Sequence, residues 1–197
     1  FRAHSFPTRR SFDLYIIVFH DIFFSLMKIV NNLIEKINNN KNLKIIHTND
    51  GSCSIYNEII NEVYHSRNGA IQESLHVFIL NGLNHFSNHQ SIKILEVGMG
   101  TGLNVILTYL NSNNIKIEYH ALEPYPLKTS IISNLNYGDL LKSNKIFKKI
   151  HNCSFNEIVS LSSKFNFIKH EIEFLNFNIK GFDLIYYDAF SPRAQAE

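Results

Sequence analysis

The most constraining feature of this chain is segment 92–110, where an apolar run is followed by three glycines at alternate positions and then by residues that favour a helix. The apolar run leads to Glu96, and the glycines are Gly98, Gly100 and Gly102. Because glycine lacks a Cβ, its backbone adopts positive φ at little cost and approaches a ligand closely. A buried strand, a glycine turn and a helix start form the βα unit that binds nucleotide-like cofactors. We therefore expect an α/β fold organised around this unit.

The glycine spacing indicates which cofactor class fits. A dinucleotide fingerprint, G-x-G-x-x-G, would need glycine where this chain has Leu103, which argues against a dehydrogenase. The observed E-x-G-x-G-x-G resembles motif I of class I S-adenosylmethionine-dependent methyltransferases. That resemblance implies a Rossmann-like core and S-adenosylmethionine as cofactor. It places the three glycines against the cofactor's methionine and ribose, and it gives Glu96 the cofactor's ammonium group.

A second acidic residue closes the next predicted strand, at 115–122, which is followed by Glu123. A carboxylate at this place can accept hydrogen bonds from both hydroxyls of a cofactor ribose. A solvated carboxylate at the strand end is the alternative. We expect Glu123 to bind the ribose.

Two polar strings precede the glycine turn: T-x-D-G-S-x-x-x-Y begins at Thr48, and Y-H-S-x-x-G-A-x-x-E-S-x-H-V-F begins at Tyr64. Residue types alone would also fit an ordinary, partly buried loop. Together with motif I, the strings resemble the tRNA 5-methylaminomethyl-2-thiouridine methyltransferase family, the methyltransferase domain of the MnmC type, which also occurs as a standalone enzyme. The resemblance runs from about residue 44 to the end of the chain. It implies that Tyr64, Ser66 and Glu73 also bind the cofactor.

The last predicted strand, 182–187, is followed by Asp-Ala-Phe-Ser-Pro. This string resembles motif IV of amino-methylating enzymes and the D-A-F-x-P string of the same tRNA family. An amine must be neutral to attack a methyl group, so a carboxylate that orients it and accepts its proton would help. The resemblance implies that Asp188 is this catalytic residue, that Phe190 stacks on or walls the flipped uracil, and that Pro192 stiffens the loop.

The implied function is transfer of the cofactor's methyl group to the exocyclic amine of 5-aminomethyl(-2-thio)uridine at the tRNA wobble position. The expected partner is tRNA, and a separate flavin-dependent enzyme could supply the aminomethyl intermediate. No metal and no membrane are expected, and the cytoplasm is the expected compartment. A methyltransferase with another amine or protein acceptor, or an inactive fragment that only binds the cofactor, are the alternatives.

Three regions are expected along the chain. Residues 1–26 are interpreted as a non-native or unstructured leader, because Met27 followed by a lysine is typical of a native start. A signal peptide, a membrane anchor or a packed helix are the alternatives. An extension of hairpin and helices at 27–90 precedes the methyltransferase core at 91–197. That core is expected to be truncated, with an incomplete sheet, because the resembled family continues beyond this point. The two cysteines, 100 positions apart, favour a reducing compartment over a disulfide framework.

The predicted elements are a helix at 29–37, a hairpin of strands 44–47 and 53–56, a helix at 69–83, parallel strands near 93–97, 116–122, 166–174 and 182–187, and helices at 103–110, 127–135 and around 140–141. The strand at 182–187 is expected to form an exposed edge. The lysines of segment 142–151 would either contact RNA phosphates or form a solvated face. Glu171 or Glu173 could meet the cofactor's adenine amine, and the sequence does not choose between them.

Overall fold

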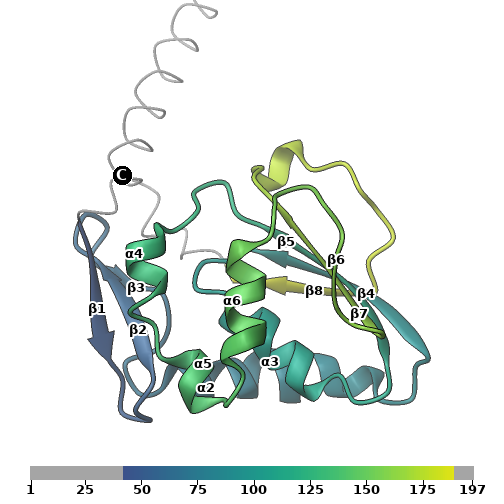
Figure 1. The fold of residues 1–197 in the computed structure, drawn as a ribbon, viewed down its shortest axis with the longest axis horizontal. Helices are drawn as coiled ribbons and strands as arrows, with labels where there is room; N and C mark the ends of the chain where they lie inside the picture. The colour runs from purple at the N-terminus through teal and green to yellow at the C-terminus, as the bar shows by residue number, and fades with distance from the viewer. Residues whose placement is uncertain (1–41, 189–197) are drawn as a thin grey trace, which may run out of the picture. The chain divides into compact units, whose positions relative to one another are not determined.

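The computed structural model of this chain describes residues 42–188 (Figure 1). Three expectations lie outside these residues: the leader at 1–26, the helix at 29–37, and the roles of Phe190 and Pro192.

A small antiparallel sheet begins the described part of the chain. Strand β1 (Leu43–His47) pairs with β2 (Cys53–Asn57), and β2 pairs with the short β3 (Glu62–Val63). The β1–β2 turn contains Gly51 at φ +82°, a conformation that glycine adopts without strain. The predicted hairpin is therefore confirmed.

The second sheet has five strands in the order β6-β7-β5-β4-β8. Four are parallel: β4 (Ser91–Val97), β5 (Lys116–Leu122), β7 (Phe165–His170) and β8 (Leu184–Tyr187). Because β5 and β8 flank β4 on opposite sides, the carboxyl end of β4 is the topological switch point, where open α/β sheets bind ligands. The α/β, Rossmann-like prediction is confirmed.

Two features of this sheet differ from the prediction. The antiparallel strand β6 (Val159–Ser162) was not expected, because it offers only two apolar residues in four. Strand β7 ends at His170, whereas the predicted strand ran to 174. The residues beyond it turn away from the ladder and form the short 3₁₀ helix η4 (Phe174–Asn176).

The helical elements are α2 (Ala70–Ser74), the π-helix η2 (Leu75–Leu80), the 3₁₀ helix η3 (Leu83–Phe86), α3 (Leu103–Asn111), α4 (Thr129–Ile132), α5 (Tyr137–Leu140) and α6 (Asn144–Asn152). The helix predicted at 127–135 is reduced to α4. Two side chains, Ser133 and Asn134, donate hydrogen bonds back to the Ser130 carbonyl, and such bonds compete with helix continuation. Helix α6 was not predicted, because its lysines obscure the apolar positions Phe147 and Ile150.

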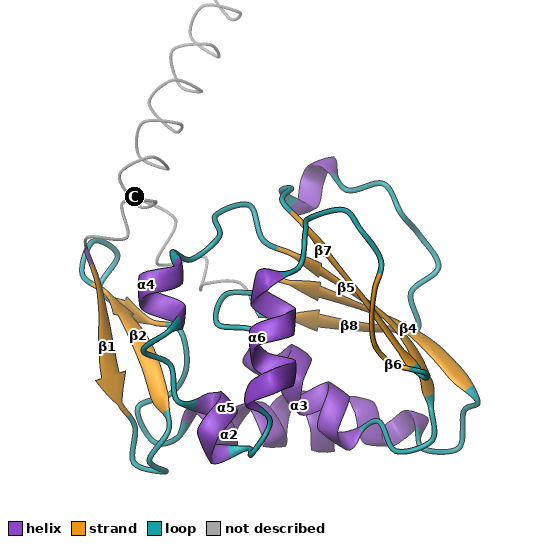
Figure 2. Cartoon of the chain, in the orientation of Figure 1, coloured by secondary structure: helices purple, strands orange, loops and turns teal. Residues whose placement is uncertain are grey.

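The main core lies on one face of the five-stranded sheet. There, the buried side chains of Ile94, Tyr119 and Phe167 pack with those of α3 and α6. Figure 2 shows these two helices in purple beside the orange strands. The opposite face is covered by a smaller cluster, in which Phe177 and Phe182 of segment 171–183 pack on the strands. Both faces of the central strands are therefore buried, as expected for a parallel sheet.

Strand β8 is an edge strand of the described sheet, as predicted. On the face of the smaller cluster, Ile185 is 55% and Tyr187 is 65% exposed. Among residues 42–188, no helix is long and apolar enough to cross a lipid bilayer.

Candidate active site

The glycine turn, defined here as residues 98–102, joins β4 to α3. Its three glycines have φ values of +89°, +49° and +71°, so each needs the left-handed backbone that glycine adopts readily. The N–H groups of Gly98 and Met99 donate to the Leu122 carbonyl at 3.1 and 3.0 Å. The turn is thereby fixed against the carboxyl end of β5.

Glu123 lies directly against this turn. Its Oε2 accepts from the Gly100 N–H at 2.6 Å, and its Oε1 accepts from the Tyr125 N–H at 2.9 Å. Burial raises the pKa of Glu123 to about 7, although both hydrogen bonds oppose the rise. The Glu123 carboxyl group is therefore fixed by two backbone N–H groups. It lies at the place where the sequence predicted a residue that binds the ribose.

The loop after β3 reaches the turn from the N-terminal extension. The ring of Tyr64 lies so close to Gly100 that a Cβ on this glycine would be 3.2 Å from it. His65, only 6% exposed, shares a 2.7 Å hydrogen bond between its Nε2 and Thr101 Oγ1. Burial lowers the pKa of His65 to about 4, so the ring is neutral near pH 7. The extension thus contributes to the site instead of forming a separate unit.

Two more predicted residues contact one another beside this loop. The Ser66 N–H donates to Glu73 Oε2 at 2.7 Å, and the Glu73 side chain comes from α2. The negative charge of Glu73 also acts on Asp188, where it helps to raise the carboxyl pKa. Ser66 and Glu73 therefore lie near the predicted catalytic residue.

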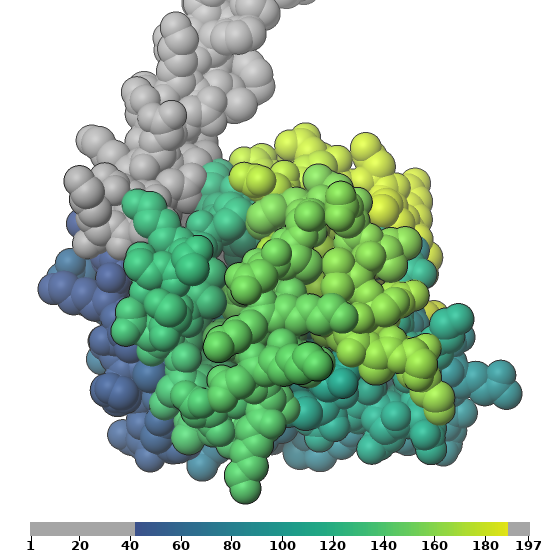
Figure 3. All heavy atoms as spheres, in the orientation of Figure 1, coloured from purple at the N-terminus to yellow at the C-terminus, as the bar shows by residue number. Residues whose placement is uncertain are grey.

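Helix α6 approaches the turn from the other side. The Nε2–H of His151 donates to the Thr101 carbonyl at 3.1 Å, and a Cβ on Gly102 would lie 3.0 Å from this ring nitrogen. Burial lowers the pKa of His151 to about 4, so it carries no charge near pH 7 and does not belong to the basic surface. The exposed lysines of α6 are Lys145, Lys148 and Lys149. Figure 3 shows this helix at the surface, as green atoms.

The predicted residues Glu96 and Asp188 are connected by Asn104 of α3. Asn104 Nδ2 donates to Glu96 Oε1 at 3.0 Å and to Asp188 Oδ2 at 2.7 Å. Burial, and then the charge of Asp188, raises the pKa of Glu96 well above its usual value. Burial also raises the pKa of Asp188 to about 7. A buried and a partly buried carboxylate thus share one amide group at the carboxyl ends of β4 and β8.

Four carboxylates now surround the glycine turn: Glu73, Glu96, Glu123 and Asp188. Within residues 42–188, no ion pair joins any of them to a lysine or an arginine. Glu73 is exposed, whereas Glu96 is buried and Glu123 and Asp188 are partly buried. Acidic groups that lose water without gaining a cationic partner are electrostatically costly. The arrangement therefore favours a cationic ligand. No group of three or more histidine, cysteine or acidic side chains in the described part of the chain could hold a metal ion.

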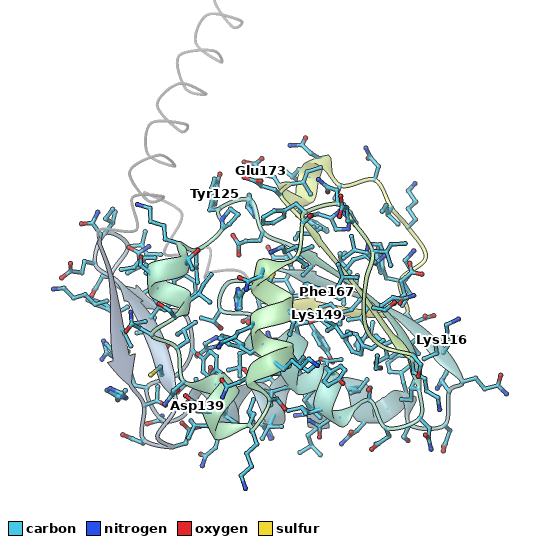
Figure 4. All side chains as sticks on the ribbon, viewed as in Figure 1. Lys116, Tyr125, Asp139, Lys149, Phe167 and Glu173 are labelled. Atoms are coloured by element: carbon cyan, nitrogen blue, oxygen red, sulfur yellow. The ribbon has the colours of Figure 1, made fainter. Side chains whose placement is uncertain are left out.

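The outer rim of the site is formed by the segments that follow β5 and β7. The hydroxyl of Tyr125 donates to Glu173 Oε1 at 3.2 Å, and Figure 4 shows these two side chains close together beyond the strand ends. Of the two alternatives for the adenine amine, Glu173 is thus the one bound to the loop that carries Glu123. Contact of either residue with a cofactor stays a prediction.

Three side chains of this arrangement were not among the predicted site residues: Asn104, His65 and His151. Asn104 offered one signal, because it is a polar residue in the otherwise apolar run Leu103–Leu107 that follows the glycines. His65 stood inside the quoted family string. His151 offered none, since it lies among lysines.

Comparison with known proteins relates this geometry to named relatives. No family model matches the chain. A Leptospira interrogans protein named tRNA 5-methylaminomethyl-2-thiouridine biosynthesis bifunctional protein MnmC is 27% identical over 161 residues, which cover 71% of this chain and 24% of that protein. The protein of the same name from Cupriavidus metallidurans is 27% identical over 172 residues, or 77% of this chain and 25% of its own. The chain resembles the MnmC proteins.

This finding confirms the family resemblance predicted from the sequence. The chain spans about a quarter of the length of these MnmC relatives. The crystal structure of MNMC2 from Aquifex aeolicus has a TM-score of 0.57 to this structure at 23% identity, and the match covers 77% of this chain and 50% of that one. The structural match supports the Rossmann-like fold.

Proposed function

We propose that this chain is an S-adenosylmethionine-dependent N-methyltransferase that acts on the exocyclic amine of 5-aminomethyl(-2-thio)uridine at the tRNA wobble position. The observation that carries the proposal is the place of Asp188. Its partly buried carboxylate follows β8 at the switch point of the sheet, and Asn104 connects it to Glu96 beside the glycine turn. The names of the MnmC relatives support the choice of tRNA as substrate.

The residues of the turn fit this cofactor. Three glycines with positive φ leave the backbone open to close approach, and Glu123 stands beside them with both oxygens directed at backbone N–H groups. Glu96 Oε2 is buried and has no hydrogen-bond partner among residues 42–188. The uncompensated carboxylates suit a ligand that carries a sulfonium and an ammonium group.

Each carboxylate has a distinct part in the proposed site. Glu123 accepts hydrogen bonds from the ribose hydroxyls, and Glu96 provides negative charge for the ammonium end. Tyr64, Ser66 and Glu73 close the side formed by the N-terminal extension. When bound, S-adenosylmethionine supplies a methyl group on a sulfonium, and the amine lone pair forms the N–C bond as the S–C bond breaks with its electrons staying on sulfur.

Asp188 prepares the amine for this reaction. An alkylammonium has no lone pair to donate, so Asp188 accepts one proton from it and later releases that proton to solvent. A pKa near 7 is matched to this task, because the carboxylate is available at neutral pH and is still a useful base. Phe190 and Pro192, which lie outside the described residues, are proposed to wall the uracil and to stiffen the loop.

The test uses tRNA from cells that lack the methylation step. The protein is incubated with this tRNA and S-adenosylmethionine labelled on its methyl group, and the digested nucleosides are separated by mass. We expect the label in the 5-methylaminomethyl nucleoside of the anticodon. The variant Asp188→Asn should lower kcat by roughly 10²–10⁴-fold, while Glu58→Gln on the exposed hairpin should not change it.

Two outcomes would contradict the proposal. Label in a protein or a small amine, with none in tRNA, would favour a methyltransferase with another acceptor. Absence of transfer together with absence of cofactor binding would favour a fragment that has lost the activity.

A further inference from the structure

The side chain of Asn104 makes two hydrogen bonds that join elements far apart in the sequence. It is the second residue of α3 and is 1% exposed. Its Nδ2 donates to Glu96, eight residues earlier, and to Asp188, 84 residues later. One amide group thus fixes two carboxylates on neighbouring strands: Glu96 lies near the end of β4, and Asp188 directly follows β8.

The geometry of these hydrogen bonds indicates that the Asn104 amide orients the carboxylate of Asp188. Both hydrogens of the Asn104 amide are directed at carboxylate oxygens, and Asp188 binds through Oδ2 alone. Among residues 42–188, this bond to Oδ2 is the one side-chain hydrogen bond that acts on Asp188. The carboxylate is therefore held by one oxygen and presents the other.

We propose that Asn104 is a positioning residue, whose amide holds Asp188 through Oδ2 so that the other carboxylate oxygen is left for the amine. The proposal rests on the proposed function. It assigns to Asn104 the orientation and proton affinity of the base, and not a contact with substrate.

A purely structural role explains the geometry less well. The side chain donates to two carboxylates and not to the helix backbone. Asparagine also has a lower helix propensity than leucine or alanine, which suit a buried position. Its Oδ1 is buried without a partner among the described residues, which costs free energy. An apolar residue at this position would avoid this cost. The two hydrogen bonds that Asn104 donates to the carboxylates therefore compensate for it.

The other groups that face the pair are acidic or neutral. Tyr119 of β5 and Tyr186 of β8 lie beside Glu96, and the charges of Glu73 and Glu123 act on Asp188 and Glu96 respectively. Each of these negative charges opposes ionisation of the pair. Within the described residues, the Asn104 amide is the group that favours the charged form of Asp188, so its removal should be measurable.

The experiment measures the carboxyl carbon of Asp188 by ¹³C NMR across a pH titration, in the free protein and in two variants. Asn104→Ala should raise the pKa of Asp188 by about one unit, because one hydrogen bond to a charged group is lost. The acid limb of the kcat/KM profile should move by the same amount. Asn111→Ala removes the same side chain from the far end of α3, where it bonds only to the Leu107 carbonyl, and should leave both values unchanged.

The titration needs no substrate, so it separates this inference from the proposed function. An unchanged Asp188 pKa in folded Asn104→Ala would overturn the positioning role, even if methyl transfer to tRNA is found. If Asn104→Ala raises the pKa of Asp188 but the wild-type protein does not methylate tRNA, the positioning role of Asn104 is supported and the proposed function is rejected. If Asn104→Ala does not fold, Asn104→Ser, which keeps one donor, should shift the pKa by less in the same direction; no shift would overturn the inference.

Discussion

At the scale of single residues, the raised pKa of Glu123 makes the stability of the protein depend on pH. Its carboxyl pKa rises from 4.5 to about 7 on folding, because the group is buried against the glycine turn. Well below pH 4.5 the group is protonated in both folded and unfolded chains, so it adds no pH dependence to the free energy of unfolding. Between 4.5 and about 7 the unfolded chain ionises while the folded chain keeps the proton, so the free energy of unfolding falls as pH rises.

Glu123→Gln should remove this pH dependence. Between pH 4.5 and 7.5 the wild type should lose on the order of 3 kcal/mol of unfolding free energy relative to the variant. A constant offset is expected as well, because the amide has one oxygen in place of two, and its NH2 group would face one of the two backbone N–H donors. Urea unfolding at several pH values measures the slope, and parallel curves for the two proteins would show that Glu123 is not the group responsible.

Gly100 tests the shape of the turn. Its φ is +49°, and a Cβ would lie 3.2 Å from the Tyr64 ring. Gly100→Ala should lose about 1–2 kcal/mol of unfolding free energy through its left-handed backbone and should also weaken binding of S-adenosylhomocysteine. Gly51→Ala is the matched control, because φ is +82° there and a Cβ meets nothing within 4 Å.

The two glycine variants are compared by urea unfolding and by calorimetric titration. Both should lose similar stability, and only Gly100→Ala should lose affinity. Equal affinities for the two would mean that the turn does not contact the ligand.

At the scale of elements, the hairpin tip fixes α2 and with it the loop that carries Tyr64. Asp50 accepts from the Ser52 N–H and the Thr48 hydroxyl through Oδ1, and from the Gln72 N–H at the start of α2 through Oδ2. Although burial opposes the effect, hydrogen bonds led by that of the Ser52 side chain lower the pKa of Asp50 to about 2. The T-x-D-G-S string therefore has a structural role as a cap supplied from another element.

Asp50→Ala should destabilise the protein by about 1–2 kcal/mol, as the loss of a helix cap does. Glu58→Ala breaks an exposed ion pair with Lys44 on the same hairpin and should cost at most about 0.5 kcal/mol. Thermal unfolding of both variants measures the difference. Equal losses would show that the tip does not stabilise α2.

The elements that the sequence predicted well share a simple physical basis. Strands β4 and β5 are rich in apolar residues, and the last four residues of each are buried, so both can be recognised without knowing which elements pack on them. Helix α6 and strand β6 are covered on one side only. Their few apolar residues, such as Phe147 and Leu161, can be recognised as buried only when the core into which they pack is known.

The site shows the same division. Glu96, the glycines and Glu123 follow from their positions at strand ends, since parallel strands bring their carboxyl ends to one edge of the sheet. The Asn104–Asp188 bond joins residues 84 positions apart, and His151 reaches Thr101 across 50 positions. Contacts of this kind depend on the packing of α3 and α6, which local patterns do not specify.

At the scale of the whole described molecule, elements far apart in the sequence contribute side chains to the glycine turn or to the carboxylates beside it. The extension supplies Tyr64 and His65, β5 supplies Glu123, α6 supplies His151, and β8 leads into Asp188. The sheet brings these groups to one edge, and no basic side chain in residues 42–188 pairs with the acidic ones. This arrangement fits the cationic cofactor that is proposed above.

The most direct test of this account is a crystal structure of the protein with S-adenosylhomocysteine. The account predicts that the ligand lies against residues 98–102, with its ribose hydroxyls at Glu123 and its sulfur on the side of Asp188. A ligand bound at any other place, or a sulfur facing away from Asp188, would contradict it.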